Sequence, residues 1–324
     1  MQKVVVTGGS GFIGTNLIDR LIADGFAVIN IDRSKPLKDE HAKYWKQIDI
    51  LDLKNLKECI TSFGPDILIH LAAVTDLDGK DLAYYSANIE GTANIIEIAS
   101  AIPTLQRVIY TSSMYVCRPG FIPSDYNTYT PHTVYGESKV QMEHLVRKIK
   151  DVSYKWCIIR PTSIWGPWFN VPYIDFFKTV YKKRFFSFSK ACTKTYGYID
   201  NTVFQIMGLL KAEESLMHQQ AFYLGDMPAI QIAEWGNEIS VEMKLGKIMN
   251  LPFFALKSAA FLGDALGLLG IRFPLTSFRL SNMTTNNVLP LEDIYNVTGK
   301  PPISRIDGVR KTLQWLSQYK GYKF

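Results

Sequence analysis

The sequence predicts an α/β fold in which a doubly wound parallel sheet is followed by a smaller C-terminal lobe. Short apolar, β-branched runs alternate with amphipathic stretches through the first half of the 324-residue chain, and this alternation builds a parallel sheet with helices on both faces. The runs are continuously apolar, as in Val4–Val6, which suits strands buried on both sides. After Pro161 the rhythm fades, and Pro, Trp, Phe and Tyr become dense. We therefore expect a sheet domain over 1–160 and a second lobe over 161–324, from which segments can return to the sheet.

Each element of the first domain follows from its own residues. The strands are short runs rich in Val and Ile, expected at Val4–Thr7, Ala27–Ile31, Ile67–His70, Arg107–Thr111 and Lys155–Arg160. The helices are the amphipathic stretches between them, expected near 12–24, 54–62, 82–101 and 135–149. In the second lobe, isolated helices are expected near 201–215, 230–248, 252–270 and 305–319.

Composition and charge describe an ordinary globular protein. With 47% hydrophobic and 20% charged residues, the chain is expected to fold over most of its length. The net charge of +6 is dispersed, so nucleic acid is not an expected partner. The four cysteines lie far apart and the five histidines lack ligand spacing, so we expect no metal site and no disulfide framework. Reduced thiols and the absence of a signal-peptide pattern at residues 1–6 indicate the cytoplasm.

A glycine-rich turn joins the first strand to the first helix. Gly8, Gly11 and Gly14 are spaced G-x-x-G-x-x-G. The first permits a sharp turn, the second lets a pyrophosphate approach the backbone, and the third lets the helix pack closely on the strand. The helix N-terminus then offers N–H groups and a positive dipole end to the phosphate. The motif predicts a dinucleotide site in a Rossmann-type domain; a turn without a ligand is the simpler alternative.

An acidic residue ends the second strand. A carboxylate at Asp32 can accept hydrogen bonds from the adenosine ribose and repel a 2′-phosphate, which favours NAD over NADP. Arg33 and Lys35 lie close by and can soften that preference. Asp49 and Ile50 suit an adenine contact, although an Asp at the start of a helix explains the first of them as well.

The candidate chemistry lies in a Tyr-x-x-x-Lys pair. Tyr135 and Lys139 are expected on one helical face, where the ammonium would lower the pKa of the phenol toward the working pH. Tyr135 could then take a proton from a carbinol or return one to a carbonyl. Ser113 follows the fourth strand, and a serine at the carboxyl end of a parallel strand faces the ligand crevice. It can orient a substrate oxygen beside Tyr135.

Together these motifs resemble the NAD-dependent epimerase/dehydratase family of extended short-chain dehydrogenases. The resemblance is carried by the glycine turn, Asp32, HLAA at His70–Ala73, N-x-x-G-T-x-N at Asn88–Asn94, TSS at 111–113, YGESK at 135–139, RPTSIWGP at 160–167 and YIDN at 198–201. It implies a catalytic set of Ser113, Tyr135 and Lys139. It implies an NAD site formed by Gly8, Gly11, Phe12, Ile13, Gly14, Asp32, Asp49, Ile50, Leu71, Ala72, Ala73, Asn88, Tyr135, Lys139 and Pro161.

The resemblance leaves the role of Asn88 open, implies a dimer, and includes two departures from the family's motifs. For Asn88, a structural role in holding its helix is as plausible as proximity to the site. A homodimer through the helices at 82–101 and 135–149 is expected by analogy with the family. Dehydratases of the family carry an Asp-Glu pair where this chain has Met114 and Tyr115, so elimination chemistry is disfavoured. Cys117 and Arg118 replace the usual Tyr-Gly and alter the loop at the substrate mouth.

The function implied is a 4-epimerase of a nucleotide- or polyprenyl-diphosphate-linked sugar that works through a transient 4-keto intermediate. The alternative is an NAD(P)-dependent oxidoreductase, either a 4-keto-sugar reductase or a 3β-hydroxysteroid-type dehydrogenase. An NAD-binding sensor or scaffold without activity is a third hypothesis, disfavoured because Tyr135 and Lys139 are both present.

The second lobe is expected to bind mainly substrate. The run from Arg160 to Trp168 falls where the family binds the substrate's phosphate and ring. Its aromatic residues can stack on a ligand or form core: Trp165, Trp168, Phe169 and Tyr173. Lys182–Arg184 can meet a diphosphate or simply end a helix.

The C-terminal segments resemble those of relatives with membrane-associated substrates. The helix at 252–270 and the stretch 270–302 carry this resemblance. Lys257 and Asp264 interrupt the apolar run, so it falls short of a spanning helix. It can lie on a bilayer as a peripheral contact, or pack on the second lobe.

Overall fold

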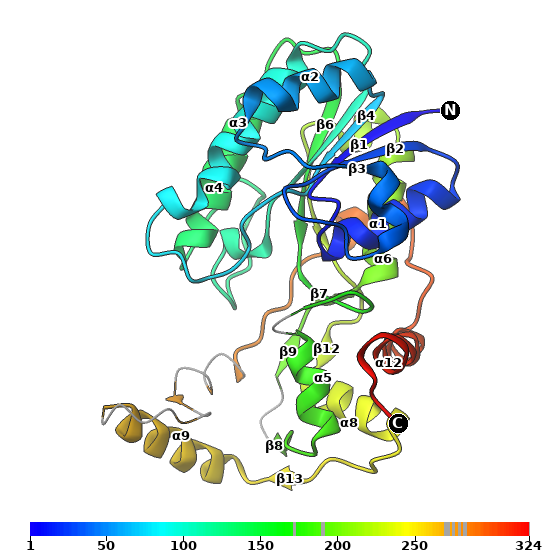
Figure 1. Cartoon of the computed structure of the whole chain (residues 1–324). Helices are drawn as coiled ribbons and strands as arrows, with labels where there is room; N and C mark the ends of the chain where they lie inside the picture. The colour runs from blue at the N-terminus through cyan, green and yellow to red at the C-terminus, as the bar shows by residue number, and fades with distance from the viewer. Residues whose placement is uncertain are drawn as a thin grey trace. The chain divides into compact units, whose positions relative to one another are not determined.

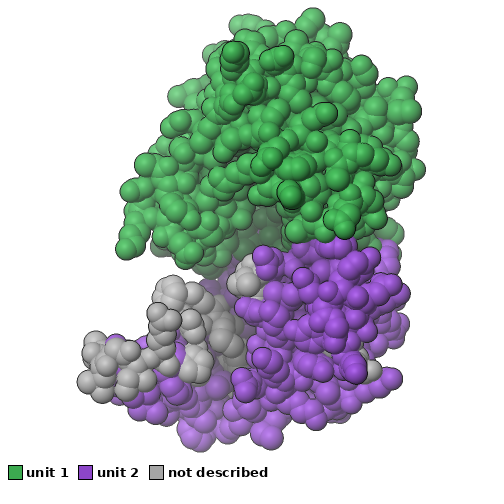
Figure 2. Space-filling view, in the orientation of Figure 1, with its two compact units in different colours: residues 1–164, 197–225, 290–302 green, residues 165–196, 226–289, 303–324 purple. Residues whose placement is uncertain are grey.

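The structure is a computed structural model that describes residues 1–170, 173–188, 192–268, 273, 276–277, 280 and 284–323. It divides into two compact units (Figure 2). Unit 1 comprises Met1–Ile164, Gly197–Gly225 and Pro290–Pro302. Unit 2 comprises Trp165–Tyr196, Asp226–Leu289 and Ile303–Phe324. Two segments from the second half of the chain therefore belong to the first unit.

Unit 1 is built on a seven-stranded parallel sheet, which confirms the predicted fold (Figure 1). The strand order is β11-β6-β5-β4-β1-β2-β3. The strands are β1 (Lys3–Thr7), β2 (Ala27–Ile31), β3 (Trp45–Lys46), β4 (Ile67–His70), β5 (Arg107–Thr111), β6 (Lys155–Pro161) and β11 (Ala221–Leu224). The chain direction across the sheet reverses between β1 and β4, and ligands of such sheets bind at the carboxyl ends beside that reversal.

Helices cover both faces of this sheet. One layer contains α2 (Leu53–Phe63), α3 (Ser86–Ser100) and α4 (Val134–Arg147). The other contains α1 (Phe12–Ala23), α6 (Ile199–Lys211) and α11 (Glu292–Thr298), and the short α7 (Glu214–Met217) precedes β11. The predicted helix at 82–101 begins as a 3₁₀ turn, η2 (Ala83–Tyr85), and becomes α-helical at Ser86.

The strand sequences explain why the sheet is the core. Val4, Val5 and Val6 have no exposed surface, because helices cover the side chains on both faces. Two strands were not predicted. β3 has only two residues, and β11 pairs with β6 from more than fifty positions further along the chain.

Unit 2 is smaller and mainly helical, with a dense aromatic core. Its helices are α5 (Tyr173–Tyr181), α8 (Ile232–Glu242), α9 (Phe253–Leu268) and α12 (Arg305–Lys320). Its short pairs are β12 (Ile230–Gln231) with β9 (Thr193–Lys194), and β13 (Asn250–Leu251) with β8 (Ser187–Phe188). Trp165 and Trp235 form its centre, with ring centroids 5.0 Å apart.

Helix α9 bears on the predicted membrane contact. The last two positions of the predicted helix at 252–270 lie outside the described residues, and so do parts of the stretch 270–302. Among the described helices, none combines the length and the apolar character needed to cross a bilayer.

Candidate active site

The glycine turn adopts the geometry that its spacing predicts. Gly8 has φ of +75°, and a Cβ there would lie 2.5 Å from the backbone nitrogen of Ala72. A Cβ on Gly14 would lie 2.4 Å from the Gly8 carbonyl oxygen. Gly11 differs, because it is exposed and its Cβ would meet only that same oxygen, at 3.3 Å. The fold therefore requires glycine at positions 8 and 14, whereas position 11 is open to an approaching ligand.

A further glycine of the turn was missed by the spacing argument. A Cβ on Gly9 would lie 2.3 Å from Oδ1 of Asn30. Asn30 is fully buried, and its Nδ2 donates to Ser10 Oγ at 3.0 Å. The polar Asn in an otherwise apolar strand was the available signal, since a buried amide needs a partner in a neighbouring loop.

Asp32 lies at the end of β2 beside the glycine turn. One carboxylate oxygen accepts from the Ser10 backbone N–H at 3.0 Å, and the other accepts from that of Ser34 at 2.8 Å. Burial raises the pKa of this carboxyl, and the charge of Asp49 adds to the rise. The two acidic side chains therefore share one neighbourhood. Ile50, by contrast, is 5% exposed and packs in the sheet core.

The remaining predicted cofactor residues follow β4, enter α1 or end β6. Leu71 donates its N–H to the Thr7 carbonyl at 2.9 Å and leads to Ala72, which packs against Gly8, and then to Ala73. Phe12 and Ile13 are half-buried in the first turn of α1, and Pro161 is buried in β6.

Asn88 uses its whole amide group inside the protein. Its Oδ1 accepts from the Val74 N–H at 2.8 Å, and its Nδ2 donates to the Val74 carbonyl at 3.0 Å. The same Nδ2 donates to Ser138 Oγ at 2.9 Å. The residue thus holds the loop after β4 to α4, which favours the structural role considered for it.

Ser113, Tyr135 and Lys139 come together at the carboxyl end of β5. Thr133 caps α4 by accepting from the Gly136 N–H at 3.0 Å, which sets Tyr135 in the first turn. The Ser113 side chain lies close enough to the Tyr135 phenol to lower its pKa. Lys139, one turn later, donates from Nζ to the Thr111 carbonyl at 3.0 Å. The arrangement can hold an alcohol or carbonyl oxygen between a hydroxyl donor and a phenol.

The electrostatics of this set differ from the sequence prediction. Burial raises the pKa of Tyr135 to about 12, opposed by the Ser113 hydrogen bond. The expected lowering by Lys139 was wrong for this structure. Burial lowers the pKa of Lys139 itself to about 8, against the negative charge of Glu143, and its ammonium is bonded to a backbone carbonyl. In this state Tyr135 is a proton donor.

A buried ion pair lies behind Lys139 and was not predicted. Glu143, one further turn along α4, binds Arg160 bidentately, with both N···O distances 2.8 Å and both side chains fully buried. Tyr129 also donates to this carboxylate at 3.0 Å, and Arg147 lies 3.5 Å from it. Although burial opposes ionisation, these charges hold the pKa of Glu143 below its usual range.

Arg160 is therefore not a ligand for substrate phosphate. Its guanidinium carbon lies 5.4–5.6 Å from the ring centroids of Tyr126, Tyr129 and Tyr223, and Nη2 donates to the Tyr126 carbonyl at 2.8 Å. Nη1 donates to the Tyr223 hydroxyl at 3.3 Å, so each of the three guanidinium nitrogens is bonded to a protein group. The expectation that this position meets the substrate fails because the long side chain turns into the core.

The aromatic run of the second lobe forms core. Trp165 and Phe169 are 0% and 3% exposed, and Trp168 packs against Trp315 with centroids 5.7 Å apart. These contacts within unit 2 favour packing over stacking on a ligand. Lys182–Arg184 is exposed just after α5.

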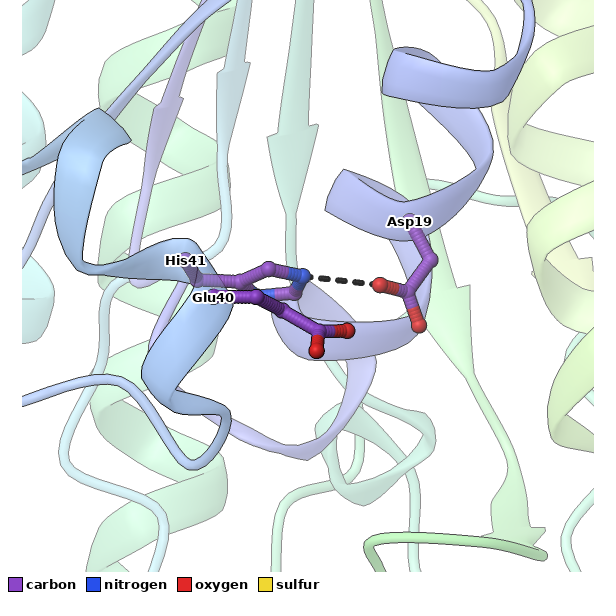
Figure 3. Close-up of side chains that lie close together, drawn as sticks. All are labelled: Asp19, Glu40 and His41. Carbon is purple, nitrogen blue, oxygen red and sulfur yellow. Dashed lines mark hydrogen bonds and ion pairs between the residues drawn. The ribbon is translucent and has the colours of Figure 1, made fainter.

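One cluster resembles a metal site in its side chains. Asp19 on α1 meets Glu40 and His41 of the 3₁₀ helix η1 (Asp39–Tyr44), with candidate ligand atoms within 4.8 Å (Figure 3). His41 Nε2 lies 2.7 Å from Asp19, and the Lys38 ammonium lies 2.6 Å from the same carboxylate. Lys38 already neutralises Asp19, so the cluster ties the loop after β2 to α1.

Comparison with known proteins finds a matching family model and relatives with two kinds of activity. The model of the NAD dependent epimerase/dehydratase family matches residues 4–182. A 3-beta-hydroxysteroid dehydrogenase of Mycolicibacterium neoaurum is 28% identical over 74% of this chain and 70% of its own. The N-acetyl-alpha-D-glucosaminyl-diphospho-ditrans,octacis-undecaprenol 4-epimerase of Escherichia coli O157:H7 is 24% identical over 97% and 95%.

The same fold occurs in solved structures. UDP-glucuronic acid 4-epimerase from Bacillus cereus, solved with UDP-glucuronic acid and NAD, superposes with a TM-score of 0.76. The match covers 98% of this chain and 99% of that one at 19% identity.

Proposed function

The chain belongs to the NAD-dependent epimerase/dehydratase family and is an NAD-dependent enzyme, and from this premise we propose that it is a sugar 4-epimerase. Its substrate is a hexose linked to a nucleotide diphosphate or a polyprenyl diphosphate, and the reaction passes through a 4-keto sugar. The observation that carries the proposal is Ser113 close to Tyr135, with Lys139 bonded to the end of β5 and with Met114 and Tyr115 in place of an Asp-Glu pair. This set can exchange a carbinol proton but lacks the acids of a dehydratase.

One structural observation supports an NAD site independently of the family assignment. Gly11 lacks a side chain although the protein leaves room for one, and it starts α1, whose first N–H groups suit a pyrophosphate. Gly8, Phe12, Ile13 and Gly14 form the rest of that turn, Leu71–Ala73 follow β4, and Pro161 is the last residue of β6. Asp32 and Asp49 would meet the adenosine half. NAD held by these residues would supply reversible hydride acceptance.

The chain's own residues then handle the proton. Ser113 orients the C4 oxygen, and Tyr135 takes its proton and gives it back. Because the pKa of Tyr135 is about 12 in this structure, the phenol must be made more acidic in the working complex. Lys139, one turn further along α4, is the candidate cation, and the ammonium stabilises a phenolate only while it remains protonated.

A lipid-linked substrate is supported by the surface of α9. Phe254 and Phe261 are 73% and 74% exposed, and Leu262 is 53% exposed. These positions lie on one face of the helix at spacings of seven and eight, with the exposed Lys257 between them. A face that joins large apolar side chains to a cation suits the surface of an anionic bilayer. We propose a peripheral membrane contact there for a cytoplasmic enzyme.

That contact can be tested with vesicles. Sedimentation with phosphatidylglycerol vesicles should retain the wild type and lose the Phe254→Ser/Phe261→Ser variant. Ile122→Ser, which removes a 64% exposed side chain from unit 1, is the matched control and should still sediment. Equal binding by all three proteins would refute the contact.

The alternative is a net oxidoreductase, a 4-keto-sugar reductase or a 3β-hydroxysteroid-type dehydrogenase. It is supported by the Mycolicibacterium relative, and the same three residues serve either reaction. The two functions differ in whether reduced cofactor accumulates.

The deciding experiment uses purified protein without added cofactor. With UDP-N-acetylglucosamine, and separately with its polyprenyl-diphosphate counterpart in detergent, an epimerase should form the 4-epimer without net NADH. Tyr135→Phe should form none. Stoichiometric NADH without any epimer would refute the epimerase and favour the alternative.

The predicted homodimer remains a proposal as well. Helices α3 and α4 pack against each other within unit 1 and would form the interface. Light scattering during size-exclusion chromatography measures the mass directly, and a monomer at micromolar concentration would contradict it.

A further inference from the structure

A continuous run of buried polar side chains links β1 to α4. Thr7 Oγ1 lies 2.7 Å from His70 Nδ1, and His70 Nε2 lies 3.1 Å from Thr92 Oγ1. Thr92 donates to the Asn88 carbonyl at 2.8 Å. The Asn88 amide donates to Ser138 Oγ at 2.9 Å, and Ser138 donates to the Tyr135 carbonyl at 2.7 Å. We call these five hydrogen bonds the His70 chain.

The donor and the acceptor in each bond of the His70 chain follow from the protons that each side chain carries. The single Thr92 hydroxyl proton is used on the Asn88 carbonyl, so its oxygen can only accept from His70 Nε2–H. Burial, together with the charge of Lys139, lowers the pKa of His70 to about 3, and a neutral imidazole with Nε2–H has an acceptor at Nδ1. Thr7 must therefore donate to Nδ1. All five donors point from β1 toward α4.

The two ends of the His70 chain lie at the two parts of the proposed site, the cofactor turn and the helix that carries Tyr135. Thr7 directly precedes Gly8, and its Oγ1 is 3.5 Å from the Ala72 N–H, the residue packed beneath that glycine. Ser138 holds the backbone of Tyr135 itself. All members from Thr7 to Ser138 are buried, with at most 2% exposure, so water does not compete for these bonds.

We propose that the His70 chain positions the Tyr135 helix against the cofactor turn, with His70, Thr92 and Asn88 as positioning residues. The proposal rests on the function given above, because it assigns the turn to NAD and Tyr135 to catalysis. It explains why a histidine stands at the end of an apolar strand. A neutral imidazole donates on one side and accepts on the other, which lets it join two hydroxyls from different elements.

The test compares isosteric variants of Thr92. Thr92→Val should lower kcat about tenfold and raise the NAD dissociation constant, because two buried hydrogen bonds are lost, the one accepted from His70 and the one donated to the Asn88 carbonyl. Thr92→Ser keeps the hydroxyl and should restore both. Thr15→Val is the matched control, since Thr15 is fully buried and its hydroxyl has no partner among the described residues. A Thr92→Val enzyme within twofold of wild type in both quantities would overturn the proposal.

A double-variant cycle tests whether the chain acts as a unit. Thr7→Val and Ser138→Ala break opposite ends, so the double variant should lose little more kcat than the worse single variant. Additive losses would refute coupling through the chain. NAD binding measured by calorimetry does not require turnover. A wild-type protein that does not bind NAD would refute the proposed function, whereas variants that bind NAD as tightly as the wild type would refute the role of the His70 chain.

Nitrogen-15 NMR provides a readout independent of NAD. The His70 signals, identified by their loss in His70→Gln, should report the neutral Nε2–H tautomer from pH 5 to 8. An imidazolium, or the opposite tautomer, within that range would contradict the bond directions.

Discussion

Glu143→Gln tests the role of the buried ion pair most sharply. The substitution keeps the shape of the side chain but removes its charge, leaving Arg160 positively charged and fully buried. Removing one partner of a buried pair costs about 3–5 kcal/mol, because the other charge stays desolvated without compensation. For a unit of roughly 200 residues this corresponds to a fall in Tm of about 10 °C. Tyr126, Tyr129 and Tyr223 around the guanidinium recover only a part of the loss.

The assay is thermal unfolding followed by circular dichroism at pH 7.5. Glu137→Gln is the matched control, because Glu137 lies on the same helix, is half-buried and has no ion pair within the described residues; its Tm should change by less than about 2 °C. Glu143→Gln/Arg160→Met removes both charges and should recover at least half of the lost stability. A fall of less than about 3 °C in Glu143→Gln would refute the view that Arg160 depends on this carboxylate.

Three further predictions concern the site and its pH dependence. Gly8→Ala should lower the Tm markedly because its Cβ would lie 2.5 Å from Ala72 N, whereas Gly11→Ala should keep the Tm and weaken NAD binding at least tenfold, as measured by calorimetry; equal effects on both quantities would contradict the assignment. Tyr135→Phe should lower kcat at least about 100-fold with NAD affinity within threefold, and wild-type kcat/KM should fall above about pH 8, where Lys139 loses its proton; a rate that keeps rising to pH 10 would oppose this role for Lys139. The depressed pKa of Glu143 contributes stability above its unfolded value near 4.5, and that stability is lost as the pH falls through the lower folded value; Glu143→Gln/Arg160→Met should therefore unfold less steeply in an acid titration followed by circular dichroism, and an identical acid transition would refute it.

Much of unit 1 could be predicted because its signals are local. Continuous apolar runs define β1, β2, β4, β5 and β6, and glycine spacing defines the turn after β1. The i, i+4 relation of Tyr135 and Lys139 needs only that α4 be helical. Local signals could not supply the environment of each side chain. For this reason the predicted direction of the Tyr135 pKa shift was wrong.

The sequence by itself determined the fold class and the family and pointed to the candidate residues for the chemistry, because periodicity, turn geometry and motif order are properties of neighbouring residues. Only the tertiary structure decided that residues 221–224 complete the sheet, that Arg160 turns inward to Glu143, and that His70 joins Thr7 to Thr92. These facts depend on burial and on partners far apart in the chain. A side chain's charge state and hydrogen bonds are set by which distant groups replace its water.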